Sequence, residues 1–266
     1  VYQTNTNGNK HLDILNVVRA AKFANDDAIK TILNDKNRHS FKLSDLSIAN
    51  NIDNGTSHDA ITDCSNTIDV AKIIYEKTNN VWNDALLLTT KKDTENFILK
   101  NKIYTSLEYY YGNTHPFLCH HILFHPEYNW SINWDMKVDP ELYLKMDRQT
   151  LAKALEASPK ICRTVKCNKS VVLLNADYAL KTQKYSEIGI EEINKRVKTL
   201  KDNPQFIELI SEILSDTNEF NKIALLTPFE GILLDGHKIE GELITPGSVV
   251  YEIIDLSKIK IIGYVN

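Results

Sequence analysis

The residues best suited to chemistry are a histidine and an aspartate five positions apart. His58 and Asp63 occur in the order His-Asp-Ala-x-x-Asp, at the start of a segment whose periodicity predicts a helix from Ser57 to Lys77. Residues five apart do not share a helix face, so both reach one site only if His58 lies in the cap before the first turn. Asp63 could then bind Mg²⁺ or Mn²⁺, and His58 could take a proton from water. This pair suits metal-assisted phosphodiester hydrolysis, but the spacing alone more often marks a capping histidine and a solvated aspartate.

Three segments with helical periodicity would position this pair. The first lies near the start of the chain, with apolar residues at Leu12, Leu15, Val18 and Ala21. A short helix follows in SFKLSDLSIANNI, opened by Ser40. In the third, the helix of Asp63, we expect the buried stripe to comprise Ile61, Cys64, Ile68, Ala71 and Ile74 or Tyr75.

The rest of the chain changes character twice. Residues 81–100 predict one further helix, and the aromatic segment 103–137, interrupted by glycine and prolines, predicts short strands. After a helix at 147–157, the TVKCNKSVVLLNA segment predicts one or two strands, and two helices separated at Asn203-Pro204 follow. Beyond residue 217, strand-like apolar runs alternate with turns, which indicates a different kind of domain.

Composition limits the class of protein. The 266 residues are 42% apolar, which is enough for a globular core. A net charge of −4 and a pI near 6.1 argue against a protein held on nucleic acid by bulk positive charge, so any such contact must come from a local cleft. Four cysteines without a CxxC pair indicate reduced thiols. Neither a membrane span nor an export signal is visible, so we expect a cytoplasmic location and no membrane partner for residues 1–217.

Seven motifs follow one another in a characteristic order between residues 12 and 217. They are LDILNVVRAA, SFKLSDLSIANNI, HDAITDCSNTIDVAKII, YYYGNTHPF, FHPEYNWSINWDMKVDPELYLKMDRQTLAKAL, ICRTVKCNKSVVLLNADYAL and IGIEEINKRVKTLKDNPQFIELISEIL. Through these motifs, residues 12–217 resemble bacterial exonuclease I, of the proofreading-type DEDDh nuclease superfamily.

The resemblance implies a mixed α/β (α+β) chain with several domains. Residues 1–77 would be the C-terminal part of a ribonuclease H-like DEDDh exonuclease domain, and 78–185 a small β-rich domain that completes a DNA cleft. Residues 186–217 would begin a helical C-terminal domain, and 218–266 would form a β-rich, lipoyl-like tail.

The implied activity is metal-dependent 3′-to-5′ hydrolysis of single-stranded DNA to mononucleotides, in DNA repair and recombination. Two Mg²⁺ or Mn²⁺ ions serve each complete site, with His58 as the general base and Asp63 as the last metal-binding carboxylate. The family's Asp-x-Glu and middle Asp have no counterpart here, and neither Asp13 nor Asp59 stands at their positions. We therefore expect an internal piece that is inactive alone, with an exposed apolar face and poor packing over residues 12–76.

Clefts for single strands use stacking aromatics and phosphate contacts. The residues we select for these roles are Lys42, Tyr110, Trp130 and Lys166, although strand aromatics are more often core residues and lysines solvated. A single-stranded DNA-binding protein is a further possible partner. The cluster His115, Cys119, His120, His121 and His125 fits no standard zinc spacing.

The tail contains short turn motifs at Pro228 to Gly231, Gly241-Glu242, Pro246-Gly247 and Asp255 to Ser257. Through these residues the tail resembles a segment of a periplasmic membrane-fusion adaptor of efflux pumps. A nuclease joined to such a segment suggests a fusion or assembly artefact, which reading the genomic DNA across codons 215–225 would test. Two other functions stay open: a non-catalytic module that binds single-stranded DNA or a partner, and an envelope efflux adaptor fragment.

Overall fold

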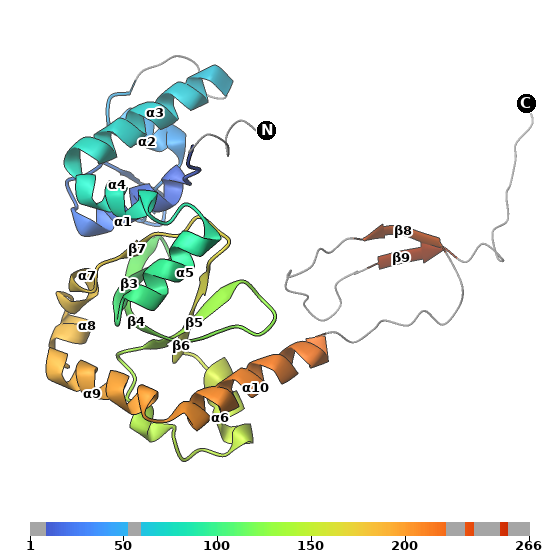
Figure 1. Cartoon of the computed structure of the whole chain (residues 1–266). Coiled ribbons are helices and arrows are strands. Elements are labelled where there is room, and N and C mark those ends of the chain that lie inside the picture. Colours follow the sequence, from blue (N-terminus) through green and yellow to red (C-terminus); the bar gives the residue numbers. More distant parts are fainter. Residues whose placement is uncertain (1–8, 53–59, 222–231, 237–250, 255–266) are drawn as a thin grey trace, which may run out of the picture. The chain divides into compact units, whose positions relative to one another are not determined.

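The computed structural model describes residues 9–52, 60–221, 232–236 and 251–254. The chain divides into two compact units, Val1–Asn218 and Glu219–Asn266. Figure 1 shows the elements of each unit. In the described residues of the second unit, β8 (Ile232–Gly236) pairs antiparallel with β9 (Tyr251–Ile254). The tail residues on which the adaptor resemblance rests lie outside the described residues.

The first unit begins with helices that surround one apolar core. They are α1 (Ile14–Ala24), α2 (Leu43–Ala49), α3 (Ala60–Lys77) and α4 (Asn79–Leu86), with a small hairpin of β1 (Ile32–Leu33) and β2 (His39–Ser40) between α1 and α2. The core side chains are less than 7% exposed and include Val17, Val18, Leu46, Val70, Ile74, Val81 and Ala85. The three helices predicted before residue 77 are confirmed, but the expectation of poor packing there was wrong.

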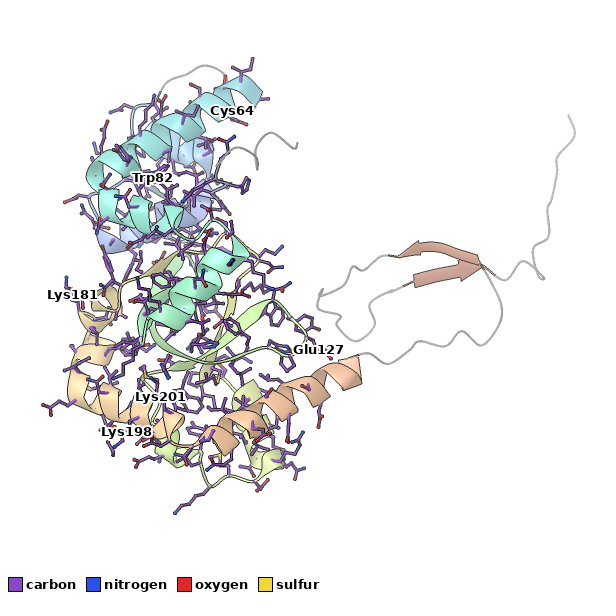
Figure 2. All side chains as sticks on the ribbon, in the orientation of Figure 1. Cys64, Trp82, Glu127, Lys181, Lys198 and Lys201 are labelled. Atoms are coloured by element: carbon purple, nitrogen blue, oxygen red, sulfur yellow. The ribbon has the colours of Figure 1, made fainter. Side chains whose placement is uncertain are left out.

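The face that α3 buries differs from the predicted stripe. Ile61 is 79% exposed and Ile68 is 56% exposed. Cys64 is also exposed (Figure 2). Tyr75 is exposed and Ala71 half-buried, whereas Thr62, Asn66, Val70 and Ile74 are buried. The helix contacts α1, α2 and α4 through the face with the smaller and polar residues. The expected stripe was therefore wrong except at Ile74, and the expectation of an exposed apolar face is confirmed.

Residues 81–100, predicted as one helix, form two. Helix α4 ends at Leu86 and α5 (Lys91–Lys100) starts after Thr90. Thr90 caps α5: its Oγ1 accepts a hydrogen bond from the Asp93 backbone N–H at 3.1 Å and donates one to the Asp93 carboxylate at 2.6 Å. The break lets Leu88, 2% exposed, enter the core of the sheet.

A five-stranded antiparallel sheet forms the centre of the first unit. Its order is β6-β5-β4-β3-β7. Gly112, with φ +83°, and Tyr111, with φ +52°, form the tight turn between β3 and β4. A register shift between His121 and Leu123 interrupts the pairing of β4 with β5. The strand bounds are β3 Tyr104–Tyr110, β4 Asn113–Phe124, β5 Trp130–Asp135, β6 Cys162–Lys166 and β7 Leu173–Leu174.

Alternate residues of the strands enter two different cores. Phe117 and Cys119 pack in one core with Ile98 of α5, and Leu118 between them packs in the other with Trp134. The second core is completed by helices from the β5–β6 connection and from the residues after β7. These are η2 (Pro140–Leu142), α6 (Arg148–Glu156), α7 (Asp177–Leu180), α8 (Gln183–Ser186), α9 (Ile190–Lys201) and α10 (Pro204–Asn221).

The predicted strands at 103–137, the helix at 147–157 and the helix break at Asn203-Pro204 are confirmed. The mixed α/β class is also confirmed, and the structure adds that its central sheet is antiparallel. The finer division of residues 1–217 into three domains stays a prediction. None of the helices in the described residues is both long and apolar enough to cross a membrane.

Candidate functional site

Asp63 lies in the first turn of α3, where carboxylates interact favourably with the helix dipole. Its side chain is half-buried, and within the described part of the chain its carboxylate has no hydrogen-bond or ion-pair partner. Its backbone carbonyl accepts a hydrogen bond from the Thr67 hydroxyl at 2.7 Å. His58, Ser57 and Asp59 lie outside the described residues, so the predicted pairing of His58 with Asp63 stays a prediction.

A free carboxylate is a suitable hard ligand for Mg²⁺ or Mn²⁺. Across residues 9–52 and 60–221, however, no three His, Cys, Asp or Glu side chains gather closely enough to hold a metal ion. Asp13 has another role: its carboxylate caps α1 by accepting hydrogen bonds from the Leu15 N–H at 3.0 Å and the Asn16 amide at 3.3 Å. Asp63 therefore fits as one ligand of a metal site, and the described residues do not complete that site.

The histidines of β4 have separate partners. His120 Nδ1 lies 2.5 Å from the Lys102 carbonyl, and His121 Nδ1 lies 2.8 Å from the Ser131 hydroxyl. His115 stacks on Tyr110 with ring centroids 3.9 Å apart. Burial lowers the pKa of His120, and lowers that of His121 to about 4. These two rings are therefore neutral at pH 7.

Positive side chains meet in a cavity of about 320 Å³ between α1 and the sheet. Its basic residues are Arg19 of α1, Lys166 at the end of β6 and Lys169 in the β6–β7 connection. The Arg19 guanidinium lies 3.7 Å from the ring centroid of Tyr109. Of these residues, only Lys166 was among the selected site residues. Arg19 was missed, although a single cation between the buried Val18 and Ala20 of a short helix marks it as a candidate.

Of the other residues selected for DNA contact, Trp130 lies beside the cavity residue Lys166, whereas Lys42 and Tyr110 do not line the cavity. The Lys166 ammonium lies 5.1 Å from the Trp130 ring centroid, so the structure brings these two together. Trp130 in turn stacks on Tyr128 at 4.4 Å. Tyr110, 39% exposed, is at the end of β3, and Lys42 is an exposed residue immediately before α2. Lys42 and Tyr110 are not among the residues that line the cavity.

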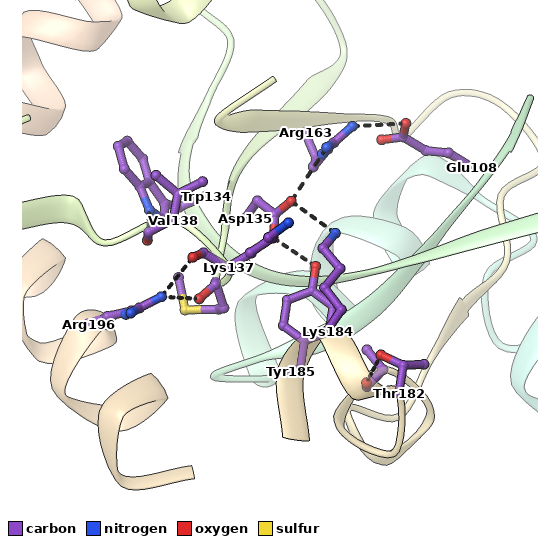
Figure 3. Close-up of polar contacts among 12 residues, drawn as sticks. Glu108, Trp134, Asp135, Lys137, Val138, Arg163, Thr182, Lys184, Tyr185 and Arg196 are labelled. Atoms are coloured by element: carbon purple, nitrogen blue, oxygen red, sulfur yellow. Dashed lines mark hydrogen bonds and ion pairs between the residues drawn. The ribbon is translucent and has the colours of Figure 1, made fainter. Parts of the chain in front are cut away.

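A polar network centred on the buried Asp135 connects three strands of the sheet to α8. The carboxylate of Asp135 is 3% exposed and accepts a hydrogen bond from the Tyr185 hydroxyl at 2.7 Å. It also pairs with Arg163 at 3.4 Å and Lys184 at 3.5 Å, and Arg163 reaches Glu108 at 3.2 Å (Figure 3). Burial lowers the pKa of Lys184 and raises that of Tyr185. The network joins β3, β5, β6 and α8, and so positions the strands that carry Lys166 and Tyr109.

Solved structures of exonuclease I share this mixed α/β fold with its central antiparallel sheet. Escherichia coli exonuclease I in complex with a dA16 oligonucleotide matches 78% of this chain with a TM-score of 0.61 and 25% identity. A structure of SSB/exonuclease I with the inhibitor CFAM matches 79% of the chain, with the same TM-score and identity. No protein-family model matches.

Curated relatives are exodeoxyribonucleases I. The protein of Buchnera aphidicola subsp. Acyrthosiphon pisum is 26% identical over 230 residues, covering 81% of this chain and 54% of the relative. That of Escherichia coli K12 is 26% identical over 229 residues, covering 80% of this chain and 48% of the relative. The chain thus spans about half the length of these relatives. The predicted exonuclease I resemblance is confirmed over about 80% of the chain, and nothing in these matches supports the efflux-adaptor resemblance of the tail.

Proposed function

We propose that this chain takes part in 3′-to-5′ hydrolysis of single-stranded DNA to mononucleotides, as part of an exonuclease I. The observation that carries the proposal is the extent of the similarity to exodeoxyribonucleases I. A match that omits less than a fifth of the chain has to include both Asp63 and Lys166, wherever it begins. The candidate metal ligand and part of the basic cavity therefore lie in the shared region.

The proposed chemistry uses Asp63 as a ligand and His58 as a base. A complete site would hold two Mg²⁺ or Mn²⁺ ions, which would activate water and stabilise the leaving 3′ oxygen. Asp63 would hold a metal through its free carboxylate, and His58 would accept a proton at a ring nitrogen. Because the described residues offer one ligand, we expect this chain alone to bind metal weakly and to cleave little.

The proposed partner is single-stranded DNA, through Lys166 and Trp130 with Lys42 and Tyr110 further out. An oligonucleotide is bound in a solved structure of the Escherichia coli relative, and another similar structure is described as SSB/exonuclease I. A single-stranded DNA-binding protein is therefore a second proposed partner. We also propose a role in DNA repair and a cytoplasmic location, which the free cysteines support.

The test compares this chain with the product of the complete reading frame that contains it. Each is incubated with Mg²⁺ and a single-stranded oligonucleotide labelled at the 3′ end, at the 5′ end, or at the 3′ end within a duplex. The proposal predicts that the complete product releases the 3′ label early, as a mononucleotide, releases the 5′ label late and degrades the duplex slowly. The chain alone should release little of either label. Binding of the single strand without cleavage by the complete product would instead favour the non-catalytic module.

A further inference from the structure

The cavity between α1 and the sheet has a rigid frame. The Asp13 N–H donates a hydrogen bond to the Ser170 hydroxyl at 2.9 Å, and the Asn16 amide donates one to the Ser170 carbonyl at 2.8 Å. These bonds attach the start of α1 to the β6–β7 connection, which carries Lys169. The distance between the helix and the connection is therefore set by hydrogen bonds that do not use the basic side chains.

Two aromatic rings hold the Arg19 side chain in place at the cavity. Its guanidinium stacks on Tyr109 at 3.7 Å from the ring centroid and lies 5.9 Å from that of Phe41, and the two rings meet edge to face at 5.6 Å. Its Nε is buried, and within the described part of the chain it has no hydrogen-bond partner. A buried N–H without an acceptor costs about 1–3 kcal/mol, more for a charged group. Arg19 also lines the cavity, so the other N–H groups of its guanidinium can donate to an acceptor there.

The charge of the cavity is positive. Lys166 and Lys169 line it with Arg19, and both lysines are exposed, so they can turn toward a bound group. The only carboxylate among the lining residues is Glu108, which is paired with Arg163 at 3.2 Å. Three cations thus face the space while its one anion is already neutralised. This arrangement favours an anion with several acceptor oxygens.

We propose that this cavity binds one phosphodiester group of single-stranded DNA, with Arg19 as the fixed donor and Lys166 and Lys169 as flanking charges. The inference rests on the proposed function and assigns a positioning role to Arg19. Trp130 and Tyr128 lie beside Lys166 and offer aromatic surface to a neighbouring nucleotide. Binding at this cavity would not depend on the DNA sequence, because only the sugar-phosphate backbone is contacted.

The experiment measures binding of a labelled twelve-nucleotide oligothymidylate by fluorescence anisotropy, without metal, at NaCl concentrations from about 50 to 200 mM. The proteins are the full chain, Arg19→Gln, Lys166→Gln and the control Lys198→Gln. Lys198 is an exposed cation on α9 and is not a lining residue of the cavity (Figure 2). Near-ultraviolet circular dichroism confirms that each variant folds, and Arg19→Lys, which keeps the charge, serves if Arg19→Gln does not fold.

Each lost phosphate contact should make the plot of log affinity against log salt less steep by about 0.7. We expect this change with Arg19→Gln and with Lys166→Gln, together with a roughly threefold to tenfold loss of affinity at the lowest salt, and no change with Lys198→Gln. Arg19→Lys should keep the salt slope and lose affinity, because lysine lacks the planar stacked donor.

Two failures are distinguishable. If the wild-type chain binds the oligonucleotide and Arg19→Gln leaves the salt slope unchanged, or Lys198→Gln reduces it equally, the cavity is not the phosphate site and the proposed function stands. If the folded wild-type chain binds no single-stranded oligonucleotide, the proposed binding function and the site are both refuted.

Discussion

Replacing Asp135 by asparagine removes a buried negative charge that pairs with two cations, Arg163 of β6 and Lys184 of α8. Asparagine keeps the size of the side chain and can still accept a hydrogen bond from the Tyr185 hydroxyl. Arg163 and Lys184, whose side chains are 12% and 28% exposed, would lose their shared carboxylate. The substitution therefore tests the charge and leaves the shape of the core unchanged.

The expected cost follows from these exposures. Breaking a fully buried ion pair costs about 3–5 kcal/mol, because the remaining charge is left without compensation. Here Arg163 keeps Glu108, and Lys184 is partly solvated. We therefore expect Asp135→Asn to lower the free energy of unfolding by about 2–4 kcal/mol, a large part of the 5–15 kcal/mol typical of a domain.

Urea denaturation followed by tryptophan fluorescence measures this difference, and Glu108→Gln is the matched control. The Glu108 side chain is 33% exposed and has one partner in the network, so its loss should cost only about 0.5–1 kcal/mol. Adding Lys184→Met to Asp135→Asn should recover part of the loss, because it removes the stranded charge. A cost below about 1 kcal/mol for Asp135→Asn would refute the reasoning.

Three further predictions concern His121, Gly112 and Asp147. The pKa of His121 in the folded chain is about 4, below its usual 6.5, so the unfolded chain binds more protons between these two values. The free energy of unfolding therefore falls as the pH drops from 6.5 to 4. His121→Gln should reduce this pH dependence by up to about 3 kcal/mol, less for solvent screening, as measured by denaturation curves at pH 7 and 4.5. Gly112→Ala should lower the free energy of unfolding by about 1–2 kcal/mol, because φ is +83° and a Cβ would lie 2.6–2.9 Å from Arg38 side-chain carbons; an unchanged thermal midpoint would contradict this. The Asp147 carboxylate caps α6 by accepting a hydrogen bond from the Thr150 N–H at 3.0 Å. Asp147→Ala should therefore lower the free energy of unfolding by about 0.5–2 kcal/mol in chemical denaturation, whereas Asp147→Ser should retain most of this stability.

Local patterns in the sequence predict most of the elements. Helix α1 follows its periodicity, α10 begins at Pro204 as the helix break predicts, and the aromatic strands occupy the predicted segment. The single helix predicted over 81–100 failed because the cap at Thr90 and the burial of Leu88 outweigh continuous helical propensity. Such a break depends on tertiary packing, which periodicity alone does not report.

The candidate site shows the same limit. Asp63 is a candidate metal ligand because of its spacing from His58 and the surrounding motifs; the structure places it in the first turn of α3, and its role stays a prediction. The stripe of apolar residues on α3 gave the wrong buried face, because the helix packs on its neighbours through Thr62, Asn66 and Val70. The proposed role of Arg19 was not predicted from the sequence, because it depends on Tyr109 and Lys166, which are distant in sequence.

The most direct test of the account is the role of Asp63 in cleavage. The product of the complete reading frame, its Asp63→Asn variant and the control Asp69→Asn are compared for Mg²⁺-dependent release of the 3′ nucleotide from a labelled single strand. Asp69 lies on the same helix and pairs with Lys72 at 2.8 Å, so its loss should leave the rate nearly unchanged. We predict that Asp63→Asn lowers the rate at least about a hundredfold, as expected for loss of a metal ligand that supplies several kcal/mol in the transition state. Equal release by wild type and Asp63→Asn, or no release by a folded wild-type protein, would contradict the account.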